Sequence, residues 1–171
     1  MKTRLLSLLA VTAAFFVSLG TAQAQQVNAA NPESVVRYLQ DKGYRALIET
    51  REDGSQVLKT ALNGWEYSIY FVDCDAERVC HSLQFLLGFD LPNGTTLAAA
   101  NDFNFRYMIG TASIDDENDP WLEWLVSTRG GLTASNFDDV MEWWATAINL
   151  FEQSFPFEEP KDKSEDSEAD Q

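Results

Sequence analysis

The chain has 171 residues, of which 45% are hydrophobic, 12% aromatic and 23% charged, a composition typical of one ordinary globular domain. Twelve Lys and Arg residues against 27 Asp and Glu residues give a formal net charge of −15, which repels phosphate backbones and anionic lipid headgroups. The charge therefore argues against nucleic-acid binding and against a role at a membrane surface.

The N-terminal segment has the pattern of a secretory signal peptide. Two basic residues precede an apolar stretch from Leu5 to Leu19, and the small residues Ala22 and Ala24 stand before Gln25. We expect cleavage between Ala24 and Gln25. No Cys follows at once, which argues against a lipid anchor, and no later apolar run is long enough to span a membrane. The expectation is an exported, periplasmic protein with no membrane contact after cleavage.

The first predicted element after this segment is a helix. Asn31 can cap it, Pro32 suits the first helical position, and Glu33 complements the helix dipole. The helix is expected to run from Pro32 to about Lys42, where Gly43 can end it in a left-handed conformation.

Apolar residues then alternate with polar ones, which predicts four antiparallel strands. The first is expected around Tyr44 to Glu49 and the second around Gln56 to Leu62. Asn63-Gly64 predicts a type I′ hairpin turn, because both central residues of that turn need positive φ. The third strand begins at Trp65, and the fourth runs from His81 to Phe89.

A second helix and two further strands are expected next. Thr95 can cap a helix from Thr96 to about Phe105. Strand character returns from Tyr107 to Ile114 and from Trp121 to Thr128, joined by an acidic turn over Asp115 to Pro120.

The last predicted helix has the clearest pattern. Ser135 and Asp138 have the spacing of a capping box at its start. Apolar residues follow at helical spacing over about five turns: Phe137, Val140, Met141, Trp144, Ile148, Phe151 and Phe155. From Glu158 to Gln171 the composition is acidic and lacks large apolar residues, which predicts a disordered tail.

These elements predict an α+β fold of two layers, with three helices against one antiparallel sheet of five to six strands in the order α-β-β-β-β-α-β-β-α. Four segments are expected: a signal peptide over residues 1–24, a leader over 25–31, the α+β domain over 32–157, and a disordered acidic tail over 158–171.

Cys74 and Cys80 are the two cysteines of the chain, and they flank a short connection between two predicted strands. Residues that face each other across a hairpin are close enough for a disulfide, and an exported protein meets an oxidising compartment. We therefore predict a structural disulfide. A redox or metal site is the alternative, although His81 is the one neighbouring ligand type and the spacing is not Cys-x-x-Cys.

No motif for catalysis, a cofactor or a metal is found. His81, the sole histidine, alternates with the apolar residues of its strand, which favours a structural role. Glycine-rich nucleotide motifs and the zinc motif His-Glu-x-x-His are absent. The acidic turn could hold Ca²⁺, but Pro120 and Val126 stand where a calcium loop needs Gly and an acid. We expect no catalytic residues, no cofactor and no metal.

Several motifs resemble the YbjN-domain proteins, which are described as bacterial sensory transduction regulators. They are Asn63-Gly64-Trp65, the Cys74 to Cys80 loop running into His81-Ser82-Leu83-Gln84-Phe85, Leu91-Pro92-Asn93-Gly94, and Trp143-Trp144. The resemblance covers roughly Pro32 to Phe155. It implies a fold similar to type III secretion chaperones, which bind other polypeptides and are often dimeric, and it brings no catalytic residues with it.

Aromatic residues are expected on both faces of the sheet. Trp121 and Trp124 lie three residues apart in one strand and so point to opposite faces, as do Trp65 and Tyr70. These four residues are the candidates for protein binding, because aromatic side chains on an uncovered face mark an interface. The alternative is that a helix or loop of the chain covers that face.

The function that these patterns favour is a non-enzymatic, periplasmic protein-binding module, chaperone-like or regulatory, with a polypeptide partner or a second copy. One alternative is an acidic inhibitor of a periplasmic hydrolase such as lysozyme, whose cleft the disulfide-closed loop would plug. Another is a hydrolase built from dispersed carboxylates. The inhibitor predicts salt-sensitive binding to a cationic protein, whereas the hydrolase predicts one cleft with two convergent carboxyls of raised pKa.

Overall fold

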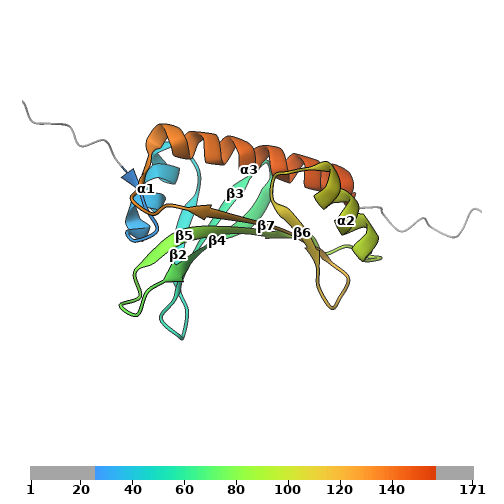
Figure 1. Cartoon of the computed structure of the whole chain (residues 1–171), viewed down its shortest axis with the longest axis horizontal. Coiled ribbons are helices and arrows are strands. Elements are labelled where there is room, and N and C mark those ends of the chain that lie inside the picture. Colours follow the sequence, from blue (N-terminus) through green and yellow to red (C-terminus); the bar gives the residue numbers. More distant parts are fainter. Residues whose placement is uncertain (1–25, 157–171) are drawn as a thin grey trace, which may run out of the picture.

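The computed structural model describes residues 26–156, so the predicted signal peptide, its cleavage site and the acidic tail lie outside the described residues. Three helices and two sheets form a layered α+β domain (Figure 1). The helices are α1 (Pro32–Asp41), α2 (Leu97–Arg106) and α3 (Ala134–Ser154). Within the described part of the chain, no helix combines the length and apolar character needed to cross a membrane.

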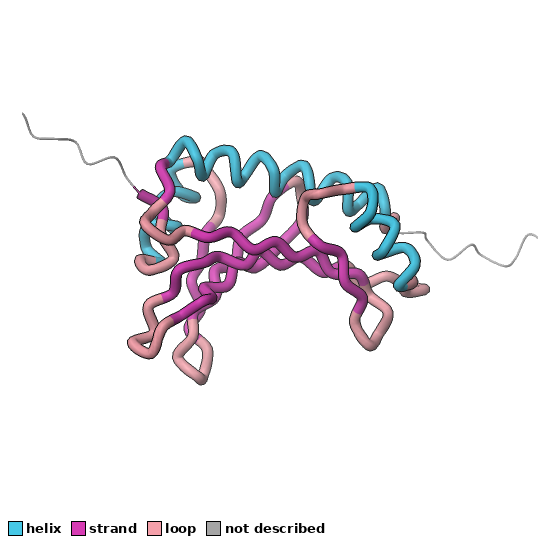
Figure 2. The backbone as a smooth tube through the Cα atoms, viewed as in Figure 1, coloured by secondary structure: helices cyan, strands magenta, loops and turns pink. Residues whose placement is uncertain are grey.

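The main sheet has six antiparallel strands in the order β2-β3-β4-β5-β7-β6, which confirms the predicted fold class. Its strands are β2 (Ala46–Thr50), β3 (Gln56–Leu62), β4 (Trp65–Cys74), β5 (Cys80–Gly88), β6 (Thr111–Ile114) and β7 (Pro120–Ser127). Helix α3 runs along one face of this sheet, with α1 near one end and α2 near the other (Figure 2).

A second, two-stranded sheet joins the predicted leader to the domain. Strand β1 (Gln26–Val27) pairs with β8 (Leu132–Thr133) just before α3. Val27 and Ala29 are buried, and the Ala29 amide donates a hydrogen bond to the Thr128 side chain at 2.9 Å. The leader is therefore part of the folded domain. A two-residue strand is too short to leave a periodic signal in the sequence.

The predicted turn residues have the expected backbone. Asn63 and Gly64 have φ of 54° and 86°, as a type I′ turn requires. Gly43 follows α1 with a φ of 84°, a conformation that glycine adopts without steric cost.

Two predicted boundaries around α2 are wrong. Thr96, rather than Thr95, caps the helix, because its side chain accepts a hydrogen bond from the Ala99 amide at 3.2 Å. Strand β6 begins at Thr111 rather than Tyr107, since Tyr107 is the C-cap of α2 and the next residues connect the helix to the strand.

The predicted start of α3 is also wrong. The helix begins at Ala134, and Thr133 caps it by accepting a hydrogen bond from the Asn136 amide at 3.1 Å. Ser135 lies inside the first turn. The Thr and Ser stand two residues apart, so either could cap a helix on local grounds, and the pairing of Thr133 with β1 decides between them.

Asp138 contacts α1 and the residue after it instead of forming the predicted capping box. Its carboxylate accepts a hydrogen bond from the Tyr38 hydroxyl and pairs with Lys42, which joins α1 to α3. The bonds from Lys42 and Tyr38 hold the pKa of the Asp138 carboxyl below its usual value.

The core lies between α3 and the sheet. Trp144 is fully buried, and its ring lies 5.3 Å from Phe85 and 5.5 Å from Tyr67, both of which belong to central strands. Near the C-terminal end of α3, the centre of the Phe151 ring lies 4.9 Å from that of Phe89 and 5.6 Å from that of Phe103. The predicted apolar side of α3 is therefore confirmed as the side that contacts the sheet.

Asn104 of α2 closes the β6 edge of the main sheet. Its amide nitrogen donates to the Ala112 carbonyl at 2.9 Å, and its oxygen accepts from the Ala112 amide at 2.7 Å. One side chain thus satisfies the two backbone groups that a neighbouring strand would bind.

We predict that Asn104→Ala lowers the free energy of unfolding by about 1 to 3 kcal/mol, because it leaves both Ala112 backbone groups without their partner. Asn101→Ala on the exposed side of α2 is the matched control, since it makes the same change in helix propensity. Urea denaturation of both variants measures the difference. Equal stabilities would show that the edge gains nothing from Asn104.

Candidate functional site

The main sheet has one face that no other described element covers. The sheet arches away from α3, and its turns project on the side opposite the helix: the β2–β3 and β4–β5 turns at one end, the β6–β7 turn at the other (Figure 1). We call this side the concave face. The strand register places on it Leu47, Glu49, Lys59, Ser68, Tyr70, Gln84, Leu86, Trp121, Glu123 and Leu125.

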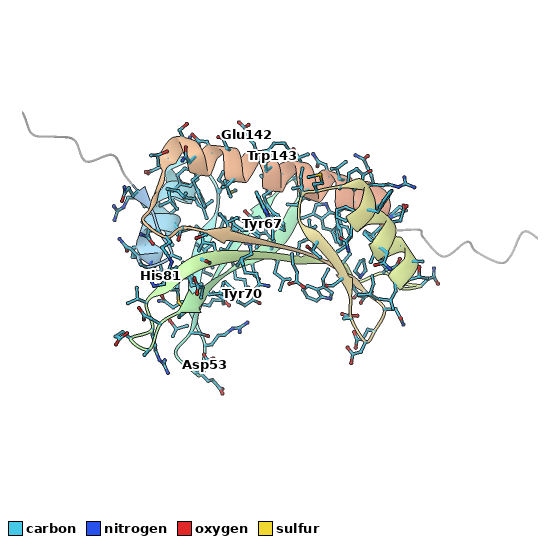
Figure 3. The ribbon with its side chains drawn as sticks, viewed as in Figure 1. Asp53, Tyr67, Tyr70, His81, Glu142 and Trp143 are labelled. Atoms are coloured by element: carbon cyan, nitrogen blue, oxygen red, sulfur yellow. A yellow bond between two sulfur atoms is a disulfide. The ribbon has the colours of Figure 1, made fainter. Side chains whose placement is uncertain are left out.

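Tyr70 lies on the concave face, on the side of the sheet opposite Tyr67, which points toward α3 (Figure 3). The Arg51 guanidinium lies 4.8 Å from the centre of the Tyr70 ring, and an Arg51 nitrogen donates to the Tyr70 hydroxyl at 3.2 Å. This stacking fixes the ring while leaving it partly exposed.

Trp121 also lies on the concave face, toward the other end. Its ring lies against Gly88, where an added Cβ atom would come within 2.8 Å of the indole, so a larger residue at that position would have to displace the ring. The indole nitrogen donates to the Asp115 carboxylate at 2.8 Å. This bond, with those from the Asp119 and Glu117 amides, lowers the pKa of the Asp115 carboxyl.

The centre of the concave face is polar. Lys59 donates to the Ser68 hydroxyl at 2.8 Å. Glu123 accepts hydrogen bonds from the Gln84 amide at 2.9 Å and the Ser113 hydroxyl at 3.1 Å. The face is therefore a mixture of hydrogen-bonding groups and apolar side chains rather than one apolar patch.

Two leucines add apolar contact area beside this polar centre. Leu47 is 57% exposed and Leu125 is 63% exposed. Leu47 lines a hollow of about 470 Å³ over strands β2 to β4, together with Arg45, Glu49, Lys59, Glu66 and Ser68. The hollow gives the concave face a depression in which a side chain of another molecule could lie.

The turns that border the concave face are acidic, and we call them the acidic rims. Their carboxylates are Glu52, Asp53, Asp73, Asp75, Glu77, Asp115, Asp116, Glu117 and Asp119. At the first end Arg129 pairs with Asp73 at 3.1 Å, and Arg78 donates to the Asp53 carbonyl at 3.0 Å. The β6–β7 turn has no Lys or Arg between residues 115 and 119. Both ends therefore present negative charge.

Trp65 and Trp124, the other two candidate binding residues, lie on the face that α3 covers. The Trp65 ring packs against Phe89 at 4.4 Å, and the Trp124 ring lies 6.1 Å from Phe85. Both are partly buried against the hydrophobic core. The predicted opposite orientation of Trp121 and Trp124 is thus observed. Of the four candidates, Tyr70 and Trp121 lie on the concave face, toward different ends.

The sequence pattern also pointed to Cys74, Cys80 and His81. The two cysteines face each other at the ends of β4 and β5 and form a disulfide bond. His81 lies beside them, with its Nε2 atom 3.7 Å from an Asp75 oxygen. Over residues 26–156, no group of three or more His, Cys, Asp and Glu side chains is arranged to hold a metal ion.

Several residues of the concave face carried no motif in the sequence. Arg51 lies in a turn, and Lys59, Gln84 and Glu123 are ordinary polar residues of alternating strands. The alternation itself contains the signal, because the residues between the buried positions must share the opposite face. The residues of the open face can be identified only once the face that α3 covers is known.

Comparison with known proteins connects this fold to one family model. The YbjN model, described as "Putative bacterial sensory transduction regulator", matches residues 31–157. The match takes in all three helices and the whole main sheet. A search of the curated proteins finds no match for the chain.

The lowered pKa of Asp115 predicts a pH dependence of the concave face. A carboxyl whose pKa is lower in the folded state stabilises the fold above its unfolded pKa, and this contribution is lost as the pH falls through the folded pKa. We expect the Trp121 indole N–H resonance to titrate with a midpoint below 3.8, the ordinary value for Asp. Asp115→Asn should abolish that titration. A midpoint at or above 3.8 would contradict the assignment.

Proposed function

The chain belongs to the YbjN family, whose description is "Putative bacterial sensory transduction regulator", and from this we propose that it is a non-enzymatic regulatory module that acts by binding a polypeptide. The observation that carries the proposal is the concave face: an uncovered sheet face with two fixed aromatic rings, exposed leucines and a hollow. Rigid aromatic side chains of this kind supply much of the binding energy at protein interfaces.

The partner that this face fits is a cationic segment. The acidic rims stand at both ends of the concave face, and the whole chain has a net charge of −15. Opposite charge raises the rate of encounter and selects the partner, while the apolar and aromatic contacts provide the affinity. Glu49, for which no ion pair is found in the described structure, gives the segment a further acidic contact in the hollow.

A narrower form of the proposal is that the partner is a basic hydrolase such as lysozyme. The observation that favours it is the loop from Asp75 to Val79, which projects from the sheet and is closed by the Cys74–Cys80 disulfide (Figure 1). Val79 at its base is 38% exposed. A short, closed, acidic loop can enter the cleft of an enzyme with little loss of conformational entropy.

We also propose that the protein acts in the periplasm. The support is the signal-peptide pattern that ends at Ala24, together with a disulfide of the kind that persists in oxidising compartments.

Intact mass spectrometry of the protein recovered from a periplasmic fraction tests the location. We expect the mass of a chain that begins at Gln25 and lacks two hydrogens for the Cys74–Cys80 bond. Recovery of the whole chain in the cytoplasm, or titration of two free thiols, would contradict the proposal.

Two Trp→Ala variants test the concave face, because they remove the same side chain from opposite faces of the sheet. Trp124→Ala removes a ring from the core side and should lower the free energy of unfolding by about 3 kcal/mol. Trp121→Ala removes one hydrogen bond on the open side and should cost about 1 kcal/mol. Chemical denaturation measures both. Equal, large losses would mean that both faces act as core.

Partner capture is measured with immobilised wild type, Tyr70→Ala and Leu125→Asp, and quantified by mass spectrometry from a periplasmic extract. We expect each concave-face variant to retain about tenfold less of a cationic protein than the wild type. Trp143→Ala is the control, since Trp143 lies on the outer side of α3, away from the sheet (Figure 3). The proposal fails if the control loses as much protein as the concave-face variants.

A parallel titration uses lysozyme and poly-L-glutamate as probes of opposite charge. Binding of lysozyme that weakens as salt is added, with no binding of poly-L-glutamate, supports a cationic partner. Binding of the anionic probe would overturn the charge argument.

A further inference from the structure

A cavity of about 380 Å³ lies between three segments that are far apart in the sequence: the residues that lead into α1, the β2–β3 turn and the β4–β5 turn. We call it the turn pocket. Phe71 forms part of its wall, and because Phe71 follows Tyr70 in β4, it lies on the opposite face of the sheet. The turn pocket is therefore a different site from the concave face.

The wall of the turn pocket is largely apolar. Ala29 and Phe71 are buried, and Pro32 and the Cys74–Cys80 disulfide lie beside them. Small organic ligands bind in cavities of about 300 to 1,000 Å³ that have apolar walls and a few placed polar groups. The turn pocket is at the lower end of that range, which suits a small ligand with one apolar group.

Asp53 supplies a negative charge from the β2–β3 turn (Figure 3). Its Oδ1 atom accepts hydrogen bonds from the Ser55 amide at 2.8 Å and from the Ser55 hydroxyl at 2.7 Å. These bonds lower the pKa of the Asp53 carboxyl, so it is ionised at neutral pH. The Oδ2 atom takes part in none of the hydrogen bonds of the described structure, so it can accept a bond from a ligand.

Arg78 supplies a positive charge from the β4–β5 turn. Its Nη1 atom donates to the Asp53 carbonyl at 3.0 Å, and a Cβ atom added at Gly54 would come within 2.8 Å of the same nitrogen. The guanidinium is thus held against the neighbouring turn. It has five N–H donors, and among residues 26–156 it forms no ion pair, so donors remain for an anionic group.

We propose that the turn pocket binds a free amino acid with an apolar side chain. The ammonium group of the ligand pairs with Asp53. Its carboxylate accepts hydrogen bonds from Arg78, whose planar guanidinium can donate two in parallel. The side chain of the ligand lies against Phe71 and the disulfide.

The charges favour a zwitterion over an ion of either sign. A simple carboxylate is repelled by a chain of net charge −15, and a simple ammonium ion leaves Arg78 without a partner and is repelled by it. An amino acid has no net charge, and its two charged groups match the two that the turns present.

This inference does not rest on the proposed function. It concerns a small ligand rather than a polypeptide, and of the side chains invoked only Asp53 also belongs to the acidic rims. Binding at the concave face and binding in the turn pocket can therefore fail independently.

Isothermal titration calorimetry of the purified protein with three probes that share one ring tests the charges. L-Phenylalanine has both charged groups, 3-phenylpropionate lacks the ammonium group, and phenethylamine lacks the carboxylate. We expect L-phenylalanine to bind at least about tenfold more tightly than either analogue, because each lacks one charged hydrogen bond. Equal binding of phenethylamine would show general attraction of cations and would overturn the proposal.

Glycine, L-leucine and L-methionine test the apolar wall. Glycine has the same two charges without a side chain and should bind at least about tenfold more weakly than L-leucine or L-methionine. Binding of glycine as tight as that of L-leucine would contradict a role for the wall. The proposal fails if none of the three apolar amino acids binds at millimolar concentration.

Two substitutions test the assigned contacts. Asp53→Asn keeps an acceptor for Ser55 but removes the charge, and should weaken L-phenylalanine by at least about tenfold without weakening 3-phenylpropionate. Arg78→Gln should weaken both. Asp116→Asn and Arg106→Gln are the matched controls, since they make the same changes of charge on the β6–β7 turn and on α2. An equal loss in the controls would assign the binding to overall charge and overturn the proposal.

Amide chemical shifts locate the site without any substitution. Addition of L-phenylalanine to the ¹⁵N-labelled wild type should shift the resonances of Ala30, Gly54 and Arg78, which line the turn pocket, and leave Leu125 of the concave face unchanged. Spectra of the ligand-free variants show whether they are folded. Shifts centred on Leu125 would place the ligand on the concave face and overturn the proposal.

Discussion

One long helix covers one face of the main sheet, and the rest of the structure depends on that contact. Helix α3 has 21 residues, and its buried side meets the central strands through Trp144. Because a strand points alternate side chains to opposite faces, burying one set against α3 leaves the other set without cover from the described helices. The concave face follows directly from a single helical layer.

The same constraint explains why the concave face is mixed rather than apolar. Its aromatic rings are each held by a polar neighbour, Tyr70 by Arg51 and Trp121 by Asp115. Between them, Glu123 is held by Gln84 and Ser113. Polar groups that are already hydrogen-bonded can face water without a further partner, while both rings stay partly exposed.

Helix α2 determines the structure of the β6 edge of the sheet. At β6 the amide of Asn104 occupies the backbone groups of Ala112, so that edge is closed to strand pairing. The helix that delivers Asn104 then turns Leu97 and Phe105 outward. Closing the edge and exposing these two side chains are therefore two consequences of one helix orientation.

The sequence by itself determined the elements whose signals are local. Alternation identified the strands, Asn63-Gly64 the hairpin turn, and the helical spacing of α3 its buried side. The hairpin position of Cys74 and Cys80, together with the export signal, also predicted their disulfide. Each of these depends on residues close together in the chain, where steric preference and side-chain period are decisive.

Only the tertiary structure decided which competing local signals prevailed. Thr133 caps α3 instead of Ser135 because β8 pairs with β1, more than a hundred residues away. Asp138 binds Tyr38 instead of its own helix end. Likewise, period two placed Trp121 and Trp124 on opposite faces but could not say which face α3 would cover. That choice comes from packing between distant segments, which no local pattern encodes.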